Sequence, residues 1–286
     1  MTASLDWLER QYWADVVAVR PDAKIDQQIA DSRVIRESAE HAATIDLCYG
    51  HDERQRLDLF SPEGEGPWPL LVFIHGGYWQ LGSKDAWSFL APGWMQKGVA
   101  VATLGYRLVP AVTLEDVAGD VRAALDYLAE NAEALKLDVS RVLVSGVSAG
   151  AHLAAMAVTE EDSAASQLSP VAALLLSGVY DPRPLAGTTP GAALKDLKSF
   201  NLSCISPLGR PPPSDCCCLI AWGADETAVF HNQSRALAAH WANWGVSATA
   251  MSLQDTNHYT VVDNLLAGRL GPVGEFVDEH LCGDPK

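Results

Sequence analysis

The chain has 286 residues, of which 48% are hydrophobic and 20% charged, an ordinary globular composition that fits one large domain or two small ones. Its net charge of −16 argues against a nucleic acid or an anionic membrane as partner. No apolar stretch has the length of a membrane span, and the first ten residues lack the pattern of a secretory signal, so we expect a cytoplasmic protein without a membrane partner.

The first part of the chain is predicted to hold a helical segment and then two strands. Residues 1–40 are mainly polar, with an apolar stripe at helical spacing, so this segment either packs on the body or covers a cleft; the stripe is Trp7, Leu8, Tyr12 and Trp13. Residues 44–49 and 56–60 alternate apolar and polar side chains around a polar turn, which predicts an antiparallel pair of strands.

Strands and helices then alternate to the end of the chain. The predicted strands are 70–74, 99–104, 142–145, 171–176, 216–222 and 246–253, and the predicted helices are 86–97, 114–135, 151–157, 231–244, 258–266 and 273–281. This alternation indicates a mostly parallel sheet with helices on both faces, preceded by the antiparallel pair. We expect a single α/β domain over residues 1–286, in which the Pro- and Gly-rich stretch 178–215 forms an excursion above the sheet.

The six cysteines do not form a metal-binding pattern. Cys216, Cys217 and Cys218 are consecutive in a predicted strand, where neighbouring side chains point to opposite faces. We therefore expect buried free thiols in a reducing compartment.

The sequence Gly146-Val-Ser148-Ala-Gly150 joins a predicted strand to a predicted helix. A serine at such a turn can be a nucleophile if a base and an oxyanion pocket reach it. The alternative is a plain strand-to-helix turn with a capping serine.

Glycines follow another predicted strand, in His75-Gly-Gly-Tyr-Trp79. Backbone N–H groups of Gly76 or Gly77, together with that of Ala149, could hold a developing oxyanion. A tight turn that binds nothing is the alternative.

A base and an acid follow the last two strands, because His258 and the neighbours Asp225 and Glu226 lie in predicted loops at the carboxyl edge of the sheet. A buried carboxylate there could orient His258, and the residues leave both acids open. The chain order serine, acid, histidine is that of α/β-hydrolases. No zinc-binding spacing, Walker motif or dinucleotide fingerprint is present, so we expect no metal and no cofactor.

These motifs resemble the α/β-hydrolase superfamily, on its hormone-sensitive-lipase-like side. His75-Gly-Gly-Tyr-Trp79 is similar to the His-Gly-Gly-x-Trp signature of kynurenine formamidases (arylformamidases), and the likeness extends to Leu8–Tyr12, Tyr49-Gly50, Leu57–Pro62, Ser148–His152, Ser177–Asp181 and Ser206-Pro207. Val147 departs from the family, in which a histidine often stands beside the serine.

The resemblance implies an α/β-hydrolase fold and a role for Glu226 as triad acid, with Asp225 as the alternative. It implies a serine hydrolase in which Ser148 attacks and His258 is the base, cleaving N-formyl-L-kynurenine or a similar aryl formamide. The alternatives are a carboxylesterase for short acyl esters and a non-catalytic binding protein. Aromatic side chains in these loops are candidates for the pocket of the small-molecule substrate: Tyr78, Trp79, Trp222 and Tyr259. The sequence leaves open whether the chain is a homodimer.

Overall fold

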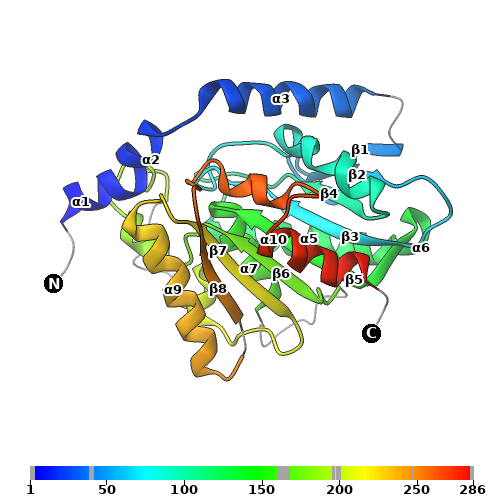
Figure 1. Ribbon diagram of the computed structural model, residues 1–286. Coiled ribbons are helices and arrows are strands. Elements are labelled where there is room, and N and C mark those ends of the chain that lie inside the picture. The colour runs from blue at the N-terminus through cyan, green and yellow to red at the C-terminus, as the bar shows by residue number, and fades with distance from the viewer. Residues whose placement is uncertain are drawn as a thin grey trace.

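Eight strands form one sheet with the order β1-β2-β4-β3-β5-β6-β7-β8 (Figure 1). The computed structural model describes residues 4–38, 42–159, 168–194, 197, 201–246 and 248–283, so small parts of the predicted segments 1–40, 178–215 and 246–253 fall outside it. The strands are β1 (Ala42–Cys48), β2 (Arg56–Ser61), β3 (Trp68–Ile74), β4 (Ala100–Leu104), β5 (Leu137–Val147), β6 (Ala172–Leu176), β7 (Cys217–Gly223) and β8 (Ala248–Leu253).

The direction of the strands is as the sequence predicts. β1 pairs with β2 and β2 with β4 in antiparallel fashion, whereas the neighbours from β4 through β3, β5, β6 and β7 to β8 are parallel. The prediction of a mostly parallel sheet with an antiparallel N-terminal pair is therefore confirmed.

Helices lie on both faces of the sheet and along one end (Figure 1). In chain order the helices and helical turns are α1 (Leu5–Glu9), η1 (Arg10–Ala14), α2 (Asp15–Ala18), α3 (Asp22–Glu37), η2 (Lys84–Leu90), α4 (Ala91–Gln96), α5 (Leu114–Glu130), α6 (Ala132–Leu135), α7 (Ala149–Val158), η3 (Arg183–Leu185), α8 (Leu202–Ile205), η4 (Pro207–Gly209), α9 (Ala228–Asn243), η5 (Val261–Leu265), α10 (Pro272–Val277) and η6 (Asp278–Cys282). None of the helices in the described ranges is long and apolar enough to cross a membrane.

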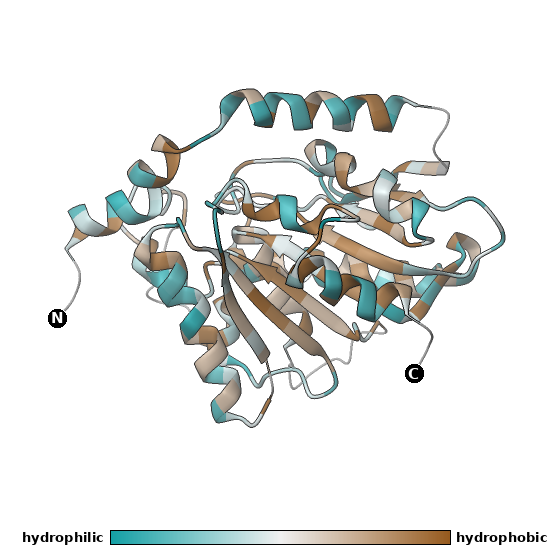
Figure 2. Cartoon of the chain, viewed as in Figure 1, coloured by the Kyte–Doolittle hydropathy of each residue, from teal (hydrophilic) through white to brown (hydrophobic). Residues whose placement is uncertain are grey.

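The core has two layers because successive side chains of a strand point to opposite faces. Leu70, Val72 and Ile74 of β3 belong to one buried cluster. Leu71 and Phe73, between them in sequence, belong to the cluster on the other face. Burial on both faces is why the central strands are uniformly apolar in Figure 2, where they are mostly brown.

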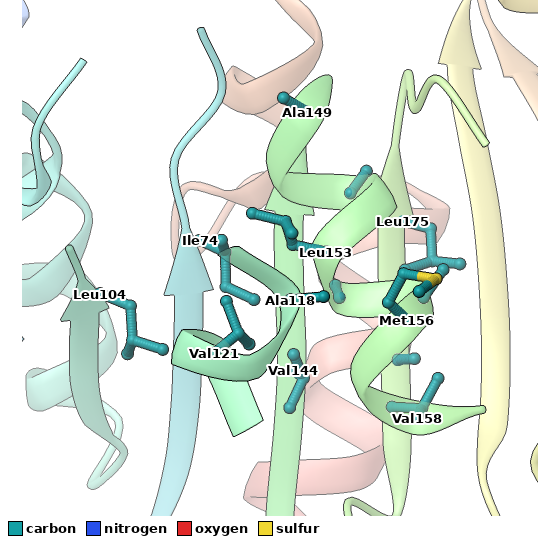
Figure 3. Close-up of a cluster of buried hydrophobic side chains, with 14 of the residues drawn as sticks. Ile74, Leu104, Ala118, Val121, Val144, Ala149, Leu153, Met156, Val158 and Leu175 are labelled. Atoms are coloured by element: carbon teal, nitrogen blue, oxygen red, sulfur yellow. The ribbon is translucent and has the colours of Figure 1, made fainter. Parts of the chain in front are cut away.

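Helix α7, which carries the chain away from Ser148, packs directly on the sheet. Ala-rich and buried along nearly its whole length, it can approach β5 and β6 closely. Figure 3 shows Leu153 and Met156 of α7 beside Val144 of β5 and Leu175 of β6. Burying each such side chain stabilises the fold by roughly 1.5–3 kcal/mol, so this packing fixes the start of α7 firmly against the sheet.

Two predictions about local structure are wrong. The helix predicted for 258–266 is reduced to the short turn η5, because the Asn257 side chain accepts the N–H groups of Tyr259 and Thr260 and holds a turn instead. The cysteines are free but not generally buried: of the six, only Cys218 is, and Cys217 is exposed at the start of β7.

Candidate active site

Ser148 lies at the sharp turn between β5 and α7 in a strained conformation. Its φ of 57° and ψ of −119° lie outside the regions that non-glycine residues prefer, at a cost of roughly 1–3 kcal/mol. The flanking glycines make the turn sterically feasible. A Cβ on Gly146 would lie 2.3 Å from the carbonyl oxygen of Gly150, and one on Gly150 would lie 2.0 Å from that of Ile74. The Gly-x-Ser-x-Gly pattern is thus required by packing.

The glycine loop after β3 lies directly beside this turn. A Cβ on Gly76 would lie 3.2 Å from the Cβ of Ser148, and Gly77 has a φ of 121° that favours glycine. Among the described residues, no hydrogen-bond acceptor takes the N–H of Gly76 or Gly77. Ala149 is the first residue of α7, so its N–H has no acceptor within the helix. These donors can bind an oxyanion.

The buried side chain of His75 stabilises the glycine loop. His75 Nδ1 lies 2.7 Å from the carbonyl oxygen of Gly76, and Tyr106 donates its hydroxyl to the His75 carbonyl oxygen at 2.9 Å. The two rings stack with centroids 4.2 Å apart. Burial lowers the pKa of His75 to about 4, so its ring is neutral at pH 7 and can brace the loop without adding charge.

Trp79 packs in the core beneath the glycine loop and does not line a pocket. It is fully buried and donates its Nε1–H to His152 Nδ1 at 3.2 Å, while His152 Nε2 lies 2.9 Å from the carbonyl oxygen of Ile205. The Nδ1 atom therefore accepts and Nε2 donates. Burial lowers the pKa of His152 to about 4. Of the pocket candidates from sequence, Trp79 has no exposed surface with which to contact a substrate.

The histidine and one of the two acids meet. His258 Nδ1 lies 2.8 Å from Glu226 Oε2, and the Glu226 side chain is fully buried. The other carboxylate oxygen, Oε1, accepts the Gly223 N–H at 2.6 Å and the Ser177 hydroxyl. Asp225 is exposed, and its backbone N–H donates to Thr256. The structure thus pairs His258 with Glu226 and leaves Asp225 on the surface.

The serine and the histidine are not hydrogen-bonded in the described part of the chain. Ser148 is 7% exposed, and its hydroxyl takes part in no hydrogen bond among those residues. The ring of Phe230 packs against His258, with centroids 4.2 Å apart, and limits the tilt of the imidazole.

The N-terminal segment contacts both the glycine loop and the loop of the acid. Tyr78 donates its hydroxyl to the carbonyl oxygen of Tyr12, and the rings of Trp13 and Tyr78 lie 5.7 Å apart. Thr227, which follows Glu226, donates to the carbonyl oxygen of Gln11 at 2.7 Å. The apolar stripe seen in the sequence is the signal for this packing, although the sequence alone leaves its partners open.

The remaining pocket candidates differ in their surroundings. Trp222 donates to His231 at 3.1 Å and lies under Arg235, so it packs against α9. The ring of Tyr259 meets His258 edge-on at 5.9 Å. Tyr259 therefore lies beside His258, and Tyr78 lies close enough to Tyr259 to interact with it electrostatically. The described residues include no group of His, Cys, Asp and Glu side chains that could hold a metal ion.

Comparison with known proteins agrees with this architecture. Residues 57–172 match the family model BD-FAE. A crystal structure from Silicibacter sp. TM1040 covers 95% of this chain and 97% of its own, with a TM-score of 0.80 and 26% identity. Esterase B from Lactobacillus rhamnosis is 22% identical and covers 96% and 92% of the two chains, with a TM-score of 0.72. The chain has the α/β-hydrolase fold.

Within this fold the chain resembles kynurenine formamidases and esterases. The kynurenine formamidase of Danio rerio is 29% identical in an alignment 279 positions long, which covers 92% of this chain and 92% of the relative. The chain therefore has hydrolase relatives that align with it along almost its whole length.

Proposed function

We propose that the protein is a serine hydrolase that works through an acyl-enzyme. The observation that carries the proposal is the buried Glu226–His258 pair, 2.8 Å apart, in a chain whose Ser148 turn lies against a glycine loop with free N–H donors. A carboxylate behind Nδ1 fixes the tautomer in which Nε2 can accept a proton.

The proposed reaction has two halves. Ser148 Oγ attacks the acyl carbon while His258 takes its proton, and the N–H groups of Gly76 or Gly77 and of Ala149 stabilise the negative oxygen. His258 then gives the proton to the leaving amine or alcohol, which departs as the carbonyl re-forms. Water, deprotonated by His258, attacks the acyl-enzyme, and the acid product leaves with Ser148 restored.

The substrate we propose is an aryl formamide such as N-formyl-L-kynurenine. The likeness to the Danio rerio kynurenine formamidase along 92% of each chain supports it. The ring of Tyr259 beside the proposed base, with Tyr78 close to Tyr259, suits an aromatic leaving group.

Short-chain carboxylic esters are the second candidate substrates. The chemistry at Ser148 would be the same, and the fold is shared with Lactobacillus rhamnosis esterase B. Comparing kcat/KM for N-formyl-L-kynurenine with kcat/KM for p-nitrophenyl acetate separates the two. A higher value for the ester would favour the esterase.

The test of the mechanism is Ser148→Ala. Loss of the nucleophile should lower kcat by at least ~10³-fold, since removing a triad serine elsewhere costs on the order of 10⁶-fold. The matched control is Ser252→Ala, at an exposed serine of β8, which should keep full activity. A fluorophosphonate should label the parent protein and not Ser148→Ala. Full activity in Ser148→Ala would refute the proposal, and failure of the parent to react with the probe would favour a non-catalytic binding protein.

A further inference from the structure

We propose that Ser177 is a positioning residue that holds the Glu226 carboxylate in the orientation that His258 needs. The inference rests on the proposed function, because it concerns the acid of the proposed triad. Ser177 does not touch the reacting atoms, and it acts through Glu226.

The first argument is the set of donors around the buried carboxylate. Only Oε2 of Glu226 faces His258, at 2.8 Å from Nδ1. The opposite oxygen, Oε1, is held by the N–H of Gly223 at 2.6 Å and by the hydroxyl of Ser177. A fully buried carboxylate needs such donors to stay ionised, and two donors on one oxygen also fix the plane of the group.

The second argument is the backbone of Ser177. The residue follows β6 with a φ of 51°, a region that favours glycine, and is fully buried. Its N–H donates to the carbonyl oxygen of Ala221 at 2.8 Å, which ties it to β7, the strand that leads into the loop of Glu226. Glycine would relieve the backbone strain at this position, so the hydroxyl is the property that a serine adds here.

The two arguments together predict a specific catalytic effect. Without the hydroxyl, Oε1 keeps one donor and the carboxylate can rotate away from Nδ1. A carboxylate that has turned away stabilises the imidazolium form of His258 less well during the reaction, so kcat should fall. Binding of substrate should change little, because Ser177 is fully buried.

The experiment uses two variants that lose the same hydroxyl but differ in backbone strain. Ser177→Ala keeps a side chain at positive φ, and Ser177→Gly relieves the strain. Both should lower kcat about tenfold or more, in line with a hydrogen bond to a charged group, with KM within about twofold.

The matched control is Ser88→Ala. Ser88 is also fully buried, but its hydroxyl has no hydrogen-bond partner among the described residues and it lies on η2. This variant should keep the parent kcat and KM. Thermal melting of each variant shows whether it folds.

A double-mutant cycle with Glu226→Gln separates positioning from a general effect. If Ser177 acts through the carboxylate, Ser177→Ala should cost less than twofold more in the Glu226→Gln background. The proposal is overturned if either Ser177 variant keeps kcat within twofold, if the loss persists undiminished beside Glu226→Gln, or if both variants lose the native melting transition. Ser148→Ala in the same assay tests the proposed function separately, because full activity there would overturn the serine mechanism whatever Ser177 does.

Discussion

Two acidic residues, Asp225 and Glu226, are adjacent in sequence after β7, and they differ in how deeply their side chains are buried. Neighbouring side chains of a turn point in different directions, and here the Glu226 side chain is fully buried against His258 while Asp225 is exposed. The residues alone leave open which of the two acids pairs with His258. The direction of each side chain depends on contacts with Gly223, Ser177 and Thr256, which the sequence does not predict. The family likeness to formamidases predicts the pairing that the structure has.

The two acids should respond very differently to loss of charge. We expect Glu226→Gln to lower kcat by ~10³- to 10⁴-fold, because an amide cannot stabilise the imidazolium and selects the wrong tautomer of His258. Asp225→Asn should keep kcat within twofold, because that side chain faces solvent. Steady-state kinetics on one substrate checks both. A collapse with Asp225→Asn alone would show that the exposed acid is the functional one.

The glycine loop shows which features of a site a sequence pattern predicts poorly. Gly76 and Gly77 lie where the motif predicts, but the aromatic residues that follow do not share one role. Tyr78 and Trp79 both have positive φ, at 52° and 59°, so the chain turns sharply and sends Trp79 into the core toward His152. Such a turn leaves no periodicity that the sequence could reveal.

At the scale of elements, the helices and strands with long apolar patterns were predictable. Helix α5 begins at Leu114, as predicted, because Thr113 and Asp116 form a capping box that fixes its first turn. The N-terminal segment was predicted as helical, and the structure divides it between α1, η1, α2 and α3, with the break at Pro21. What the sequence could not supply was the set of partners for this segment, because Tyr78, Thr227 and Gln233 all lie far from it in the chain.

A buried ion-pair cluster fastens α3 to the sheet. Arg36 of α3 pairs with Asp58 of β2 at 3.0 Å, and Lys84 of η2 pairs with the same carboxylate at 2.7 Å. The Asp58 side chain is fully buried. Figure 1 shows α3 running across the top of the molecule, where η2 is its main contact.

Breaking this cluster should destabilise the protein far more than breaking an exposed pair. Asp58→Ala removes the fully buried carboxylate from Arg36 and Lys84, which keep only the more exposed Asp46 and Asp85 as partners. We expect a loss of about 2 kcal/mol in the free energy of unfolding. The control is Asp278→Ala, which removes a half-exposed pair with Lys97 of 2.6 Å and should cost less than about 1 kcal/mol. Urea denaturation measures both. Equal losses of unfolding free energy in the two variants would mean that burial of the ion-pair cluster does not increase its contribution to stability.

For the whole molecule, the order of apolar segments in the sequence predicts an α/β fold with a mostly parallel sheet. The strand directions confirm this prediction. The strand order did not follow, because periodicity says which residues form a strand but not which strand lies beside it. β4 lies between β2 and β3, although β3 follows β2 directly in the chain. The chain then passes from β4 through α5 and α6 to β5, on the other side of β3.

The two buried histidines should make the whole fold sensitive to mild acid. His75 and His152 have pKa values near 4 in the folded protein, lowered by burial from an ordinary 6.5. Their contribution to stability is therefore full above pH 6.5. Between pH 6.5 and 4 the unfolded chain takes up protons that the folded protein does not, so the free energy of unfolding falls, by up to roughly 3 kcal/mol for each histidine.

Urea midpoints measured at pH 7.5, 6 and 5 test this expectation. His152→Gln should reduce the loss of stability between these values by about half, because one of the two groups is gone. His51→Gln, at an exposed histidine, should leave the loss unchanged. An identical pH dependence in all three proteins would show that other groups govern acid stability.

The contacts of residues 9–13 have a consequence for how the protein is made. These residues are synthesised early, yet Gln11 binds Thr227 and Tyr12 binds Gln233, on or next to α9. On the ribosome Tyr78 becomes available to this segment early, but the partners on and next to α9 appear only after more than 200 further residues. The contact between the N-terminal segment and α9 is therefore completed late in folding. An incomplete chain that ends before α9 lacks Phe230, which leaves the Tyr12 ring as exposed apolar surface for chaperones to bind.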